Sequence, residues 1–167
     1  MSSRNPHSLL RRSLVMLGLS VLAGCGFAPV YGTDSSASTL RGSIAYDMPD
    51  TPSGFHLRNR FEERLGQTEE TRFRLAVSID VSESLIGIGS DNAPSRVNLL
   101  GSASYTLTDL GGNTRSTGTV TNFTSYSTTG TTVATRAAQR DASERLMINL
   151  ADLVVTRLLA DPAAVAP

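Results

Sequence analysis

Residues 72–82 read RFRLAVSIDVS, and this stretch decides the fold of the chain. Apolar side chains occupy every second position from Phe73 to Val81, and arginine, alanine, serine and aspartate alternate with them. A period of two is typical of a β-strand with one face buried and the other in water. The stretch therefore predicts a one-sided sheet whose apolar face needs a second layer to cover it.

The residues that follow predict two more strands of the same kind. Apolar and polar positions alternate again over residues 97–107, and residues 114–132 hold nine threonines and three serines. Threonine favours extended backbone because its branched side chain is restricted in a helix. Polar, glycine-containing loops at residues 87–95 and 109–113 separate the three strands. Since short connections join neighbouring strands, we expect an antiparallel meander.

Two segments have helical spacing instead. Residues 55–67 carry an apolar residue at every fourth position among charged ones, with Ser53 as a plausible N-cap and Gly66 as a plausible stop. Residues 132–159 place alanine, leucine, methionine and valine on adjacent rows of one helical face, and Pro162 ends the segment. Each segment therefore predicts an amphipathic helix.

A short first strand is expected within residues 40–48, where Ile44 and Tyr46 alternate with small or polar residues. The predicted fold class is α+β, in the order β-α-β-β-β-α. We expect a two-layer sandwich in which two helices cover one face of a four-stranded, largely antiparallel sheet, and the other face stays polar. The expected shared core comprises Leu75, Val77, Ile79, Leu99, Tyr105, Leu146, Leu150 and Leu153.

The N-terminus has the layout of a lipoprotein signal peptide. Arginines precede an apolar run from Leu14 to Leu22, and the run ends in the lipobox pattern Leu22-Ala-Gly-Cys25. We expect residues 1–24 to be cleaved and Cys25, the only cysteine, to carry diacylglycerol. A twin-arginine signal is the alternative interpretation of Arg11-Arg12, but the residues after the pair match it loosely. Gly26 follows where aspartate would signal retention in the inner membrane, so we expect transfer to the outer membrane.

The mature chain has the length of one domain. We expect a lipidated, flexible tether at residues 25–39, a single domain at 40–160 and a disordered tail at 161–167. The chain contains no lysine, and removal of the signal peptide leaves twelve arginines against fifteen acidic residues. This charge balance argues against nucleic-acid binding. The absence of lysine fits either codon usage or a preference for the planar arginine fork at phosphates.

The sequence gives little support to an enzyme. His56 is the only histidine of the mature chain, and neither a nucleophile motif nor a second histidine at metal-ligand spacing accompanies it. The acidic pairs Glu62-Glu63 and Glu69-Glu70 lie in or beside a charged helix, which favours a solvated face. We therefore expect no catalytic residue, no metal and no cofactor apart from the covalent lipid on Cys25.

Four arginines are candidates for binding anionic groups. Arg72 and Arg74 fall on the polar side of the clearest strand, Arg96 begins the next strand, and Arg115 begins the one after it. Arginine forks at such positions can bind phosphates by charge-assisted hydrogen bonds. The alternative is that these arginines provide solubility and protect strand edges.

Three patches of the sequence resemble the lipopolysaccharide-assembly lipoprotein family (LptE-like), in its alphaproteobacterial branch. The first is Cys25-Gly-Phe-Ala-Pro-Val-Tyr-Gly32 at the predicted lipidation site. The second is Arg96-x-x-Leu99-x-Gly101-x-Ala103-x-Tyr105-x-Leu107-x-Asp109. The third is Ala138-x-x-Asp141-Ala142-x-x-Arg145, which leads into Leu150-Ala151-Asp152. Each patch alone is a weak match, but their order along the chain and the start at the predicted lipidation site together make the resemblance specific.

The resemblance implies a two-helix, four-stranded plug in the lumen of the LptD outer-membrane barrel, where it assists barrel assembly. It also implies association with lipopolysaccharide and a lipid anchor on the periplasmic side of the outer membrane. No binding residue carries over from a family motif, so Arg96, Arg115, Arg72 and Arg74 are lipopolysaccharide-binding candidates by position alone.

Two other functions stay open at this point. A periplasm-facing auxiliary lipoprotein of an ABC-type export or lipid transport system can share the lipobox and an α+β domain, and it would co-purify with a membrane ATPase. A lipid-anchored hydrolase would turn over a cell-wall or ester substrate.

Replacing Cys25 by alanine should give an unprocessed, unlipidated precursor, because the thiol is the group that forms the thioether. The fold of the domain should not change, since no predicted core position depends on this thiol. Mass spectrometry of the wild-type protein checks the assignment. A mature chain that begins anywhere but at an acylated Cys25 contradicts it.

Overall fold

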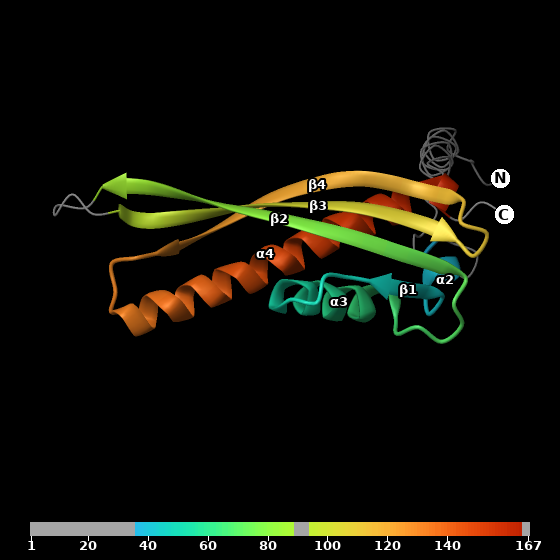
Figure 1. Ribbon diagram of the computed structural model, residues 1–167, viewed down its shortest axis with the longest axis horizontal. Coiled ribbons are helices and arrows are strands. Elements are labelled where there is room, and N and C mark those ends of the chain that lie inside the picture. Colours follow the sequence, from blue (N-terminus) through green and yellow to red (C-terminus); the bar gives the residue numbers. More distant parts are fainter. Residues whose placement is uncertain (1–35, 89–93, 165–167) are drawn as a thin grey trace, which may run out of the picture.

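The computed structural model describes residues 36–88 and 94–164. Its strands are β1 (Ile44–Asp47), β2 (Phe73–Ile88), β3 (Pro94–Asp109) and β4 (Thr114–Ser127). Its helices are α2 (Ser36–Leu40), α3 (Pro52–Leu65), α4 (Thr132–Ala160) and the short 3-10 helix η1 (Pro162–Ala164). The predicted class and element order are confirmed, with α2 and η1 as additions at the two ends (Figure 1).

The four strands form one sheet in the order β1-β2-β3-β4. The long strands pair antiparallel, with Leu75 opposite Leu107 and Ala103 opposite Val120. β1 pairs in parallel with β2, and it covers only the first four residues of β2, from Phe73 to Ala76. The sheet is thus a long three-stranded meander with a short parallel strand at one corner.

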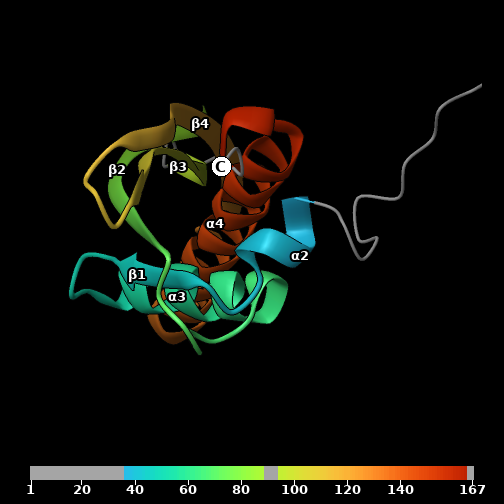
Figure 2. The same ribbon diagram turned by 90° about the vertical axis from the view of Figure 1, so that its right-hand side faces the viewer.

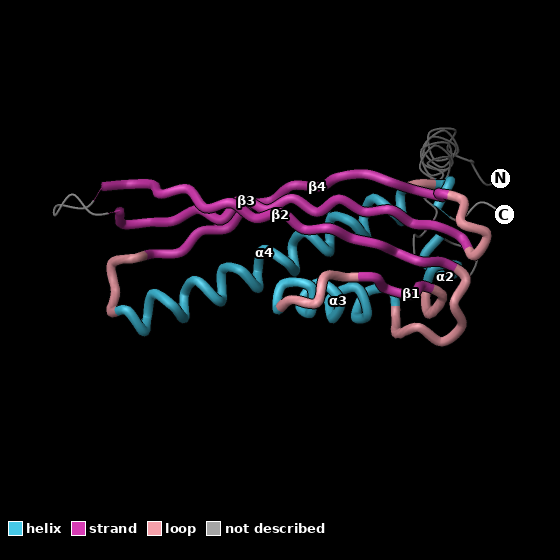
Figure 3. The backbone as a smooth tube through the Cα atoms, in the orientation of Figure 1, coloured by secondary structure: helices cyan, strands magenta, loops and turns pink. Residues whose placement is uncertain are grey.

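The helices lie on one face of this sheet, as the alternation of β2 requires. The end-on view shows α4 against the curved sheet, with α2 and α3 on the same side (Figure 2). α4 runs along the meander, whereas α3 covers only the half of the sheet nearest β1 (Figure 3). We call the half beside β1 the proximal half and the other the distal half.

The core follows the predicted pattern, and the apolar residues of β2 become more exposed toward its C-terminal end. Six of the eight predicted core residues are buried, while Ile79 and Leu153 are partly buried against the core. Further along the same face of β2, Val81 is 43% exposed and Leu85 is 67% exposed. The period of two continues beyond Ile79, but the helices cover this face of β2 only in part there.

α3 begins earlier than its sequence spacing predicts. Its N-cap is Thr51, whose hydroxyl accepts a hydrogen bond from the Gly54 amide at 3.1 Å, so Ser53 is not the cap. Pro52 lies in the first turn, where a backbone N–H has no hydrogen-bond acceptor within the helix, so its missing N–H costs nothing. The predicted stop is confirmed, because Gly66 ends the helix with a φ of 85°.

Glycine is required where α4 crosses β3. A Cβ added to Gly101 would lie 2.9 Å from the Leu146 side chain and 3.1 Å from that of Leu150. The bare backbone of Gly101 therefore lets α4 approach the sheet closely. A second contact fixes the same helix to β4, where the Thr124 hydroxyl donates a buried hydrogen bond of 2.9 Å to the Ala142 carbonyl.

Several boundaries differ from the sequence expectations. β2 continues to Ile88 and β3 begins at Pro94, so both strands extend into the predicted loop at 87–95. α2 overlaps the end of the predicted tether, and its Ala37 and Leu40 are buried. η1 overlaps the predicted tail, with Ala164 buried. The signal peptide, Cys25 and residues 165–167 lie outside the described residues.

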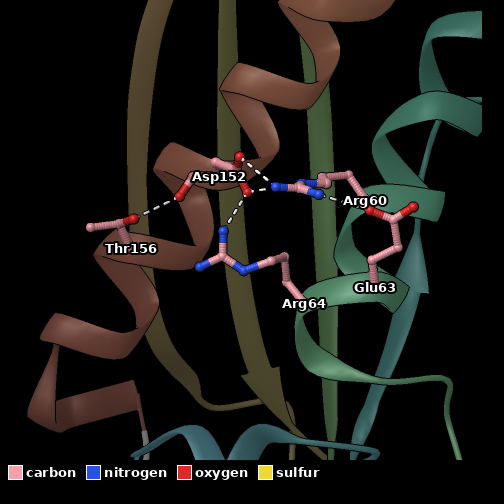
Figure 4. A network of polar contacts seen from close by, with 5 residues as sticks. All are labelled: Arg60, Glu63, Arg64, Asp152 and Thr156. Carbon is pink, nitrogen blue, oxygen red and sulfur yellow. Dashed lines mark hydrogen bonds and ion pairs between the residues drawn. The ribbon is translucent and has the colours of Figure 1, made fainter. Parts of the chain in front are cut away.

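α3 and α4 are joined by a network of ion pairs centred on Asp152 (Figure 4). Arg60 contacts both carboxylate oxygens of Asp152, with Nε at 3.0 Å and a terminal nitrogen at 2.9 Å, and Arg64 adds a bond of 2.6 Å. Hydrogen bonds to Asp152 and then Glu63 raise the pKa of Arg60 above its ordinary value. The side chains of Arg60, Arg64 and Asp152 are about 30% exposed, so these ion pairs are partly shielded from water.

We predict that Leu150→Ala lowers the free energy of unfolding by about 2–5 kcal/mol, because Leu150 is fully buried between α4 and β3. Chemical denaturation of the purified chain measures this. The matched control is Leu110→Ala, since Leu110 is 73% exposed. An unchanged midpoint for Leu150→Ala would show that α4 does not pack on the sheet as described.

Asp152→Asn should lower the free energy of unfolding by about 1 kcal/mol, since both arginines lose their charged acceptor. Asp141→Asn is the control: Asp141 pairs with Arg145 one turn away on α4, and these side chains are 67% and 52% exposed. The control should change stability by less than about 0.5 kcal/mol. Equal effects of the two substitutions would contradict a special role for the network.

Candidate functional site

The four candidate arginines do not form one cluster. Arg74 lies opposite Thr108 at the proximal end of the meander, and Arg115 follows Thr114, which is also opposite Thr108. Arg96 lies opposite Ser127 at the distal end. Ser127 is twelve positions along β4 from Arg115, or about 40 Å at ~3.3 Å per residue. One ligand head group cannot contact Arg96 and the proximal arginines together.

Arg115 is held within the β3–β4 turn. Its guanidinium contacts Asp109 through Nε at 3.1 Å and a terminal nitrogen at 3.0 Å. The amide and side chain of Asn113 also donate hydrogen bonds to Asp109. These bonds, together with the charge of Arg115, lower the pKa of Asp109. Arg115 was a binding candidate because of its position in the sequence. In the structure its guanidinium is engaged in an ion pair with Asp109 that stabilises the turn.

Arg72 and Arg74 lie near the start of β2. The Arg72 guanidinium donates a 2.6 Å hydrogen bond to the Thr39 carbonyl and lies 6.0 Å from the centre of the Phe73 ring. The bond to Thr39 links the start of β2 to α2. Arg74 is exposed on the outer face, opposite to the helices.

Arg96 has different surroundings. It is exposed on the outer face, between Ile86 of β2 and Ser127 of β4. Within residues 36–88 and 94–164, the recorded ion pairs do not include Arg96. Arg96 and Arg74 are therefore the two candidates whose guanidinium groups are exposed and take part in none of these ion pairs, in contrast to Arg115 and to Arg72, which is bonded to Thr39.

An apolar pair lies on the same face as Arg96 and was missed by the sequence reasoning. Leu100 of β3 is directly opposite Phe123 of β4, and these side chains are 53% and 63% exposed. Position 123 is out of phase with the buried Val120 and Tyr126, which is a signal that the sequence does contain. Arg96, Leu100 and Phe123 together give the distal outer face both a charged and an apolar part.

The proximal outer face is rich in hydroxyl groups. Ser104 and Thr119 are hydrogen-bonded across the strands at 2.9 Å, and Thr106 and Thr117 are 3.4 Å apart. A shallow hollow of about 480 Å³ lies over these residues. It is also lined by Ser78 of β2, by Asp47 at the end of β1 and by Met48 and Pro49 after it. This face is polar, as the alternation predicts.

His56 lies at the start of α3, half-buried, with Nδ1 3.8 Å from a carboxylate oxygen of Glu144 on α4. The described residues contain no group of three or more histidine, cysteine or acidic side chains that could hold a metal ion. Among the described helices, none is long and apolar enough to cross a membrane.

The patches that carry the family resemblance have clear structural roles where they are described. Leu99, Ala103, Tyr105 and Leu107 form the buried face of β3. Gly101 admits α4, and Asp152 joins α4 to α3. The patches therefore specify the packing of the domain, and of their described residues Arg96 alone belongs to the candidate ligand surface.

Solved structures of three bacterial lipoproteins share this fold. A lipoprotein of Caulobacter crescentus has 24% identity and a TM-score of 0.65, over 79% of this chain and 98% of that one. Rare lipoprotein B of Shewanella oneidensis has 10% identity and a TM-score of 0.55, over 71% and 92%. A minor lipoprotein of Acinetobacter baumannii has 19% identity and a TM-score of 0.53, over 71% and 90%.

A comparison with the sequences of curated proteins gives no match. The model of the LptE family, described as lipopolysaccharide-assembly, matches residues 42–158. This range runs from two residues before β1 almost to the end of α4, so it spans the sheet and both long helices. The chain therefore belongs to the LptE family of lipopolysaccharide-assembly proteins.

Proposed function

We propose that this protein is an outer-membrane lipoprotein of the lipopolysaccharide translocon. In this role it is the plug and assembly partner of the LptD β-barrel, and it binds lipopolysaccharide at the distal outer face. Family membership supports the pathway. The observation that carries the ligand site is the exposed Arg96 on the same face as the apolar pair Leu100 and Phe123.

The anchor in this proposal is Cys25, acylated after removal of residues 1–24. Several acyl chains are needed, because a single chain gives only marginal membrane binding. Residues 26–35 connect this lipid to α2, so the domain is held on the periplasmic side of the outer membrane without a membrane-spanning helix of its own.

The polar outer face suits a place inside a barrel. The lumen of an outer-membrane barrel is lined by polar side chains. Serine and threonine hydroxyls of β2, β3 and β4 dominate the proximal outer face, where they can exchange hydrogen bonds with such a wall. Cross-strand pairs such as Ser104 and Thr119 keep this surface regular.

Lipopolysaccharide combines phosphates with acyl chains, and the distal outer face offers a contact for each. The Arg96 fork can donate charge-assisted hydrogen bonds to a phosphate. Leu100 lies four positions along β3 on the same face and, with Phe123, offers apolar surface to an acyl chain. Arg115 and Arg72 are weaker candidates because they already have protein partners. Arg74 is exposed but lies opposite Thr108 and not beside an exposed apolar pair, so it offers only the contact to phosphate.

The test is Arg96→Gln in the full chain purified in detergent, with lipopolysaccharide binding measured at two salt concentrations. A hydrogen bond to a charged group contributes about 1.5–3 kcal/mol, so binding should weaken by roughly tenfold or more at low salt. Exposure to solvent makes the loss smaller at high salt.

Arg115→Gln is the matched control and should leave lipopolysaccharide binding unchanged, because Arg115 is engaged with Asp109. Both variants should still capture the barrel. Unchanged glycolipid binding by Arg96→Gln at both salts would remove Arg96 from the site. Stoichiometric capture of a membrane ATPase in place of a barrel would favour the export-auxiliary function.

A further inference from the structure

We propose that the unpaired distal edge of β2 is a docking strand for an extended, basic segment of the barrel partner, which adds to the sheet beyond β1. This inference rests on the proposed function, because that function supplies the partner. The distal edge is defined here as residues 77–86. The combination that points to it is an open backbone edge, exposed apolar side chains and a uniform negative charge.

The backbone of this edge is free in the described part of the chain. β1 pairs with residues 73–76 of β2, whereas the rest of β2 pairs only with β3 on its other side. Strand edges of this kind offer a row of N–H and C=O groups to another chain. Lysine, proline and register shifts, which commonly protect an edge, are absent from residues 77–86.

The side chains at this edge are also incompletely covered. On the helix-facing side Val81 is 43% exposed and Leu85 is 67% exposed, although they continue the alternation of the buried Leu75 and Val77. An added strand would place its own apolar side chains beside Val81 and Leu85 and extend this layer. A helix laid on this face would cover the same side chains but leave the backbone edge unpaired.

The charge of the edge selects a basic partner. Asp80 on the outer face and Glu83 on the helix-facing side are the only charged residues at positions 77–86. Glu83 is exposed and accepts a 3.2 Å hydrogen bond from Gln139 of α4. The exposed Arg136 and Arg140 of α4 form no recorded ion pair with Asp80 or Glu83 within the described residues.

The same charges disfavour self-association. Two copies that met edge to edge would bring Asp80 and Glu83 of each chain toward those of the other, and like charges on paired strands are destabilising. An extended segment with alternating apolar side chains and arginine or lysine meets the backbone, the apolar surface and the charge together. This is why the occupant is assigned to a partner chain rather than to a second copy.

The first experiment does not depend on the barrel. The probe is a synthetic peptide of about ten residues that alternates valine with threonine and carries arginines placed to face Asp80 and Glu83. Amide hydrogen exchange of the full chain in detergent is measured with and without it. We expect slower exchange at about half of residues 77–86, those whose N–H points outward, and no change along β4.

A peptide with glutamates in place of the arginines is the control and should give no protection. Unprotected amides in β2 at saturating basic peptide would overturn strand addition. Protection of β2 without any peptide, together with a dimer in sedimentation, would identify a second copy as the occupant and also overturn it.

The second experiment links the edge to the barrel. Leu85→Glu should reduce capture of LptD by about tenfold or more, whereas Leu110→Glu, at a similarly exposed residue of the opposite turn, should not. Equal unfolding midpoints of the two variants confirm that both are folded.

The two experiments separate failure of this inference from failure of the proposed function. If the wild type does not capture the barrel but the peptide protects β2, the edge is a docking strand and its partner is not the barrel. If the wild type and Leu85→Glu capture the barrel equally, the proposed function stands and the docking edge is wrong. Loss of capture without protection of β2 amides would indicate a docked helix and refute strand addition.

Discussion

The fold depends on the contact between α4 and the apolar face of the meander. A sheet that is apolar on one face is stable only when another layer removes that face from water. α4 runs along the meander and packs on β3 and β4, and Gly101 lets its Leu146 and Leu150 approach the backbone of β3. The position of α3 depends on this contact in turn. Asp152 on α4 then accepts both arginines of α3, which fixes the second helix beside the first.

The helices cover the sheet more completely in its proximal half than in its distal half, and the two halves differ in the surfaces they expose. In the proximal half α2 and α3 add to the helical layer over the sheet, and two of the three arginines there are engaged, Arg115 with Asp109 and Arg72 with the Thr39 carbonyl. In the distal half α4 alone covers the sheet, so Val81 and Leu85 remain exposed and Arg96 is available. The half that is less completely packed is therefore the half that offers surfaces to other molecules.

Periodicity alone predicted most of the architecture. The period of two in β2, β3 and β4 and the wider spacing in α3 and α4 gave the class, the order and six of the eight core residues as buried. Gly66 was identified because a helix stop is a local signal. The parallel pairing of β1 and the exposure of Val81 were not predictable in this way, because both depend on how the helices are placed over the sheet in space.

The candidate site was harder to predict than the fold, for a physical reason. Position on a strand identifies a face but not the partners on it, so Arg96 and Arg115 looked equivalent in the sequence. Asp109 is six residues from Arg115, yet the turn brings the two side chains into contact. The exposed pair of Leu100 and Phe123 depends on the register between two strands. Pairwise geometry of this kind requires the folded chain.

The short parallel ladder between β1 and β2 affects how the domain can open. β2, β3, β4 and α4 are consecutive in the chain and enclose most of the core, so they can form a cooperative unit by local contacts. α2, β1 and α3 join that unit through four ladder positions, apolar packing and the Asp152 ion pairs. A domain built in this way can loosen α2, β1 and α3 while the meander stays intact.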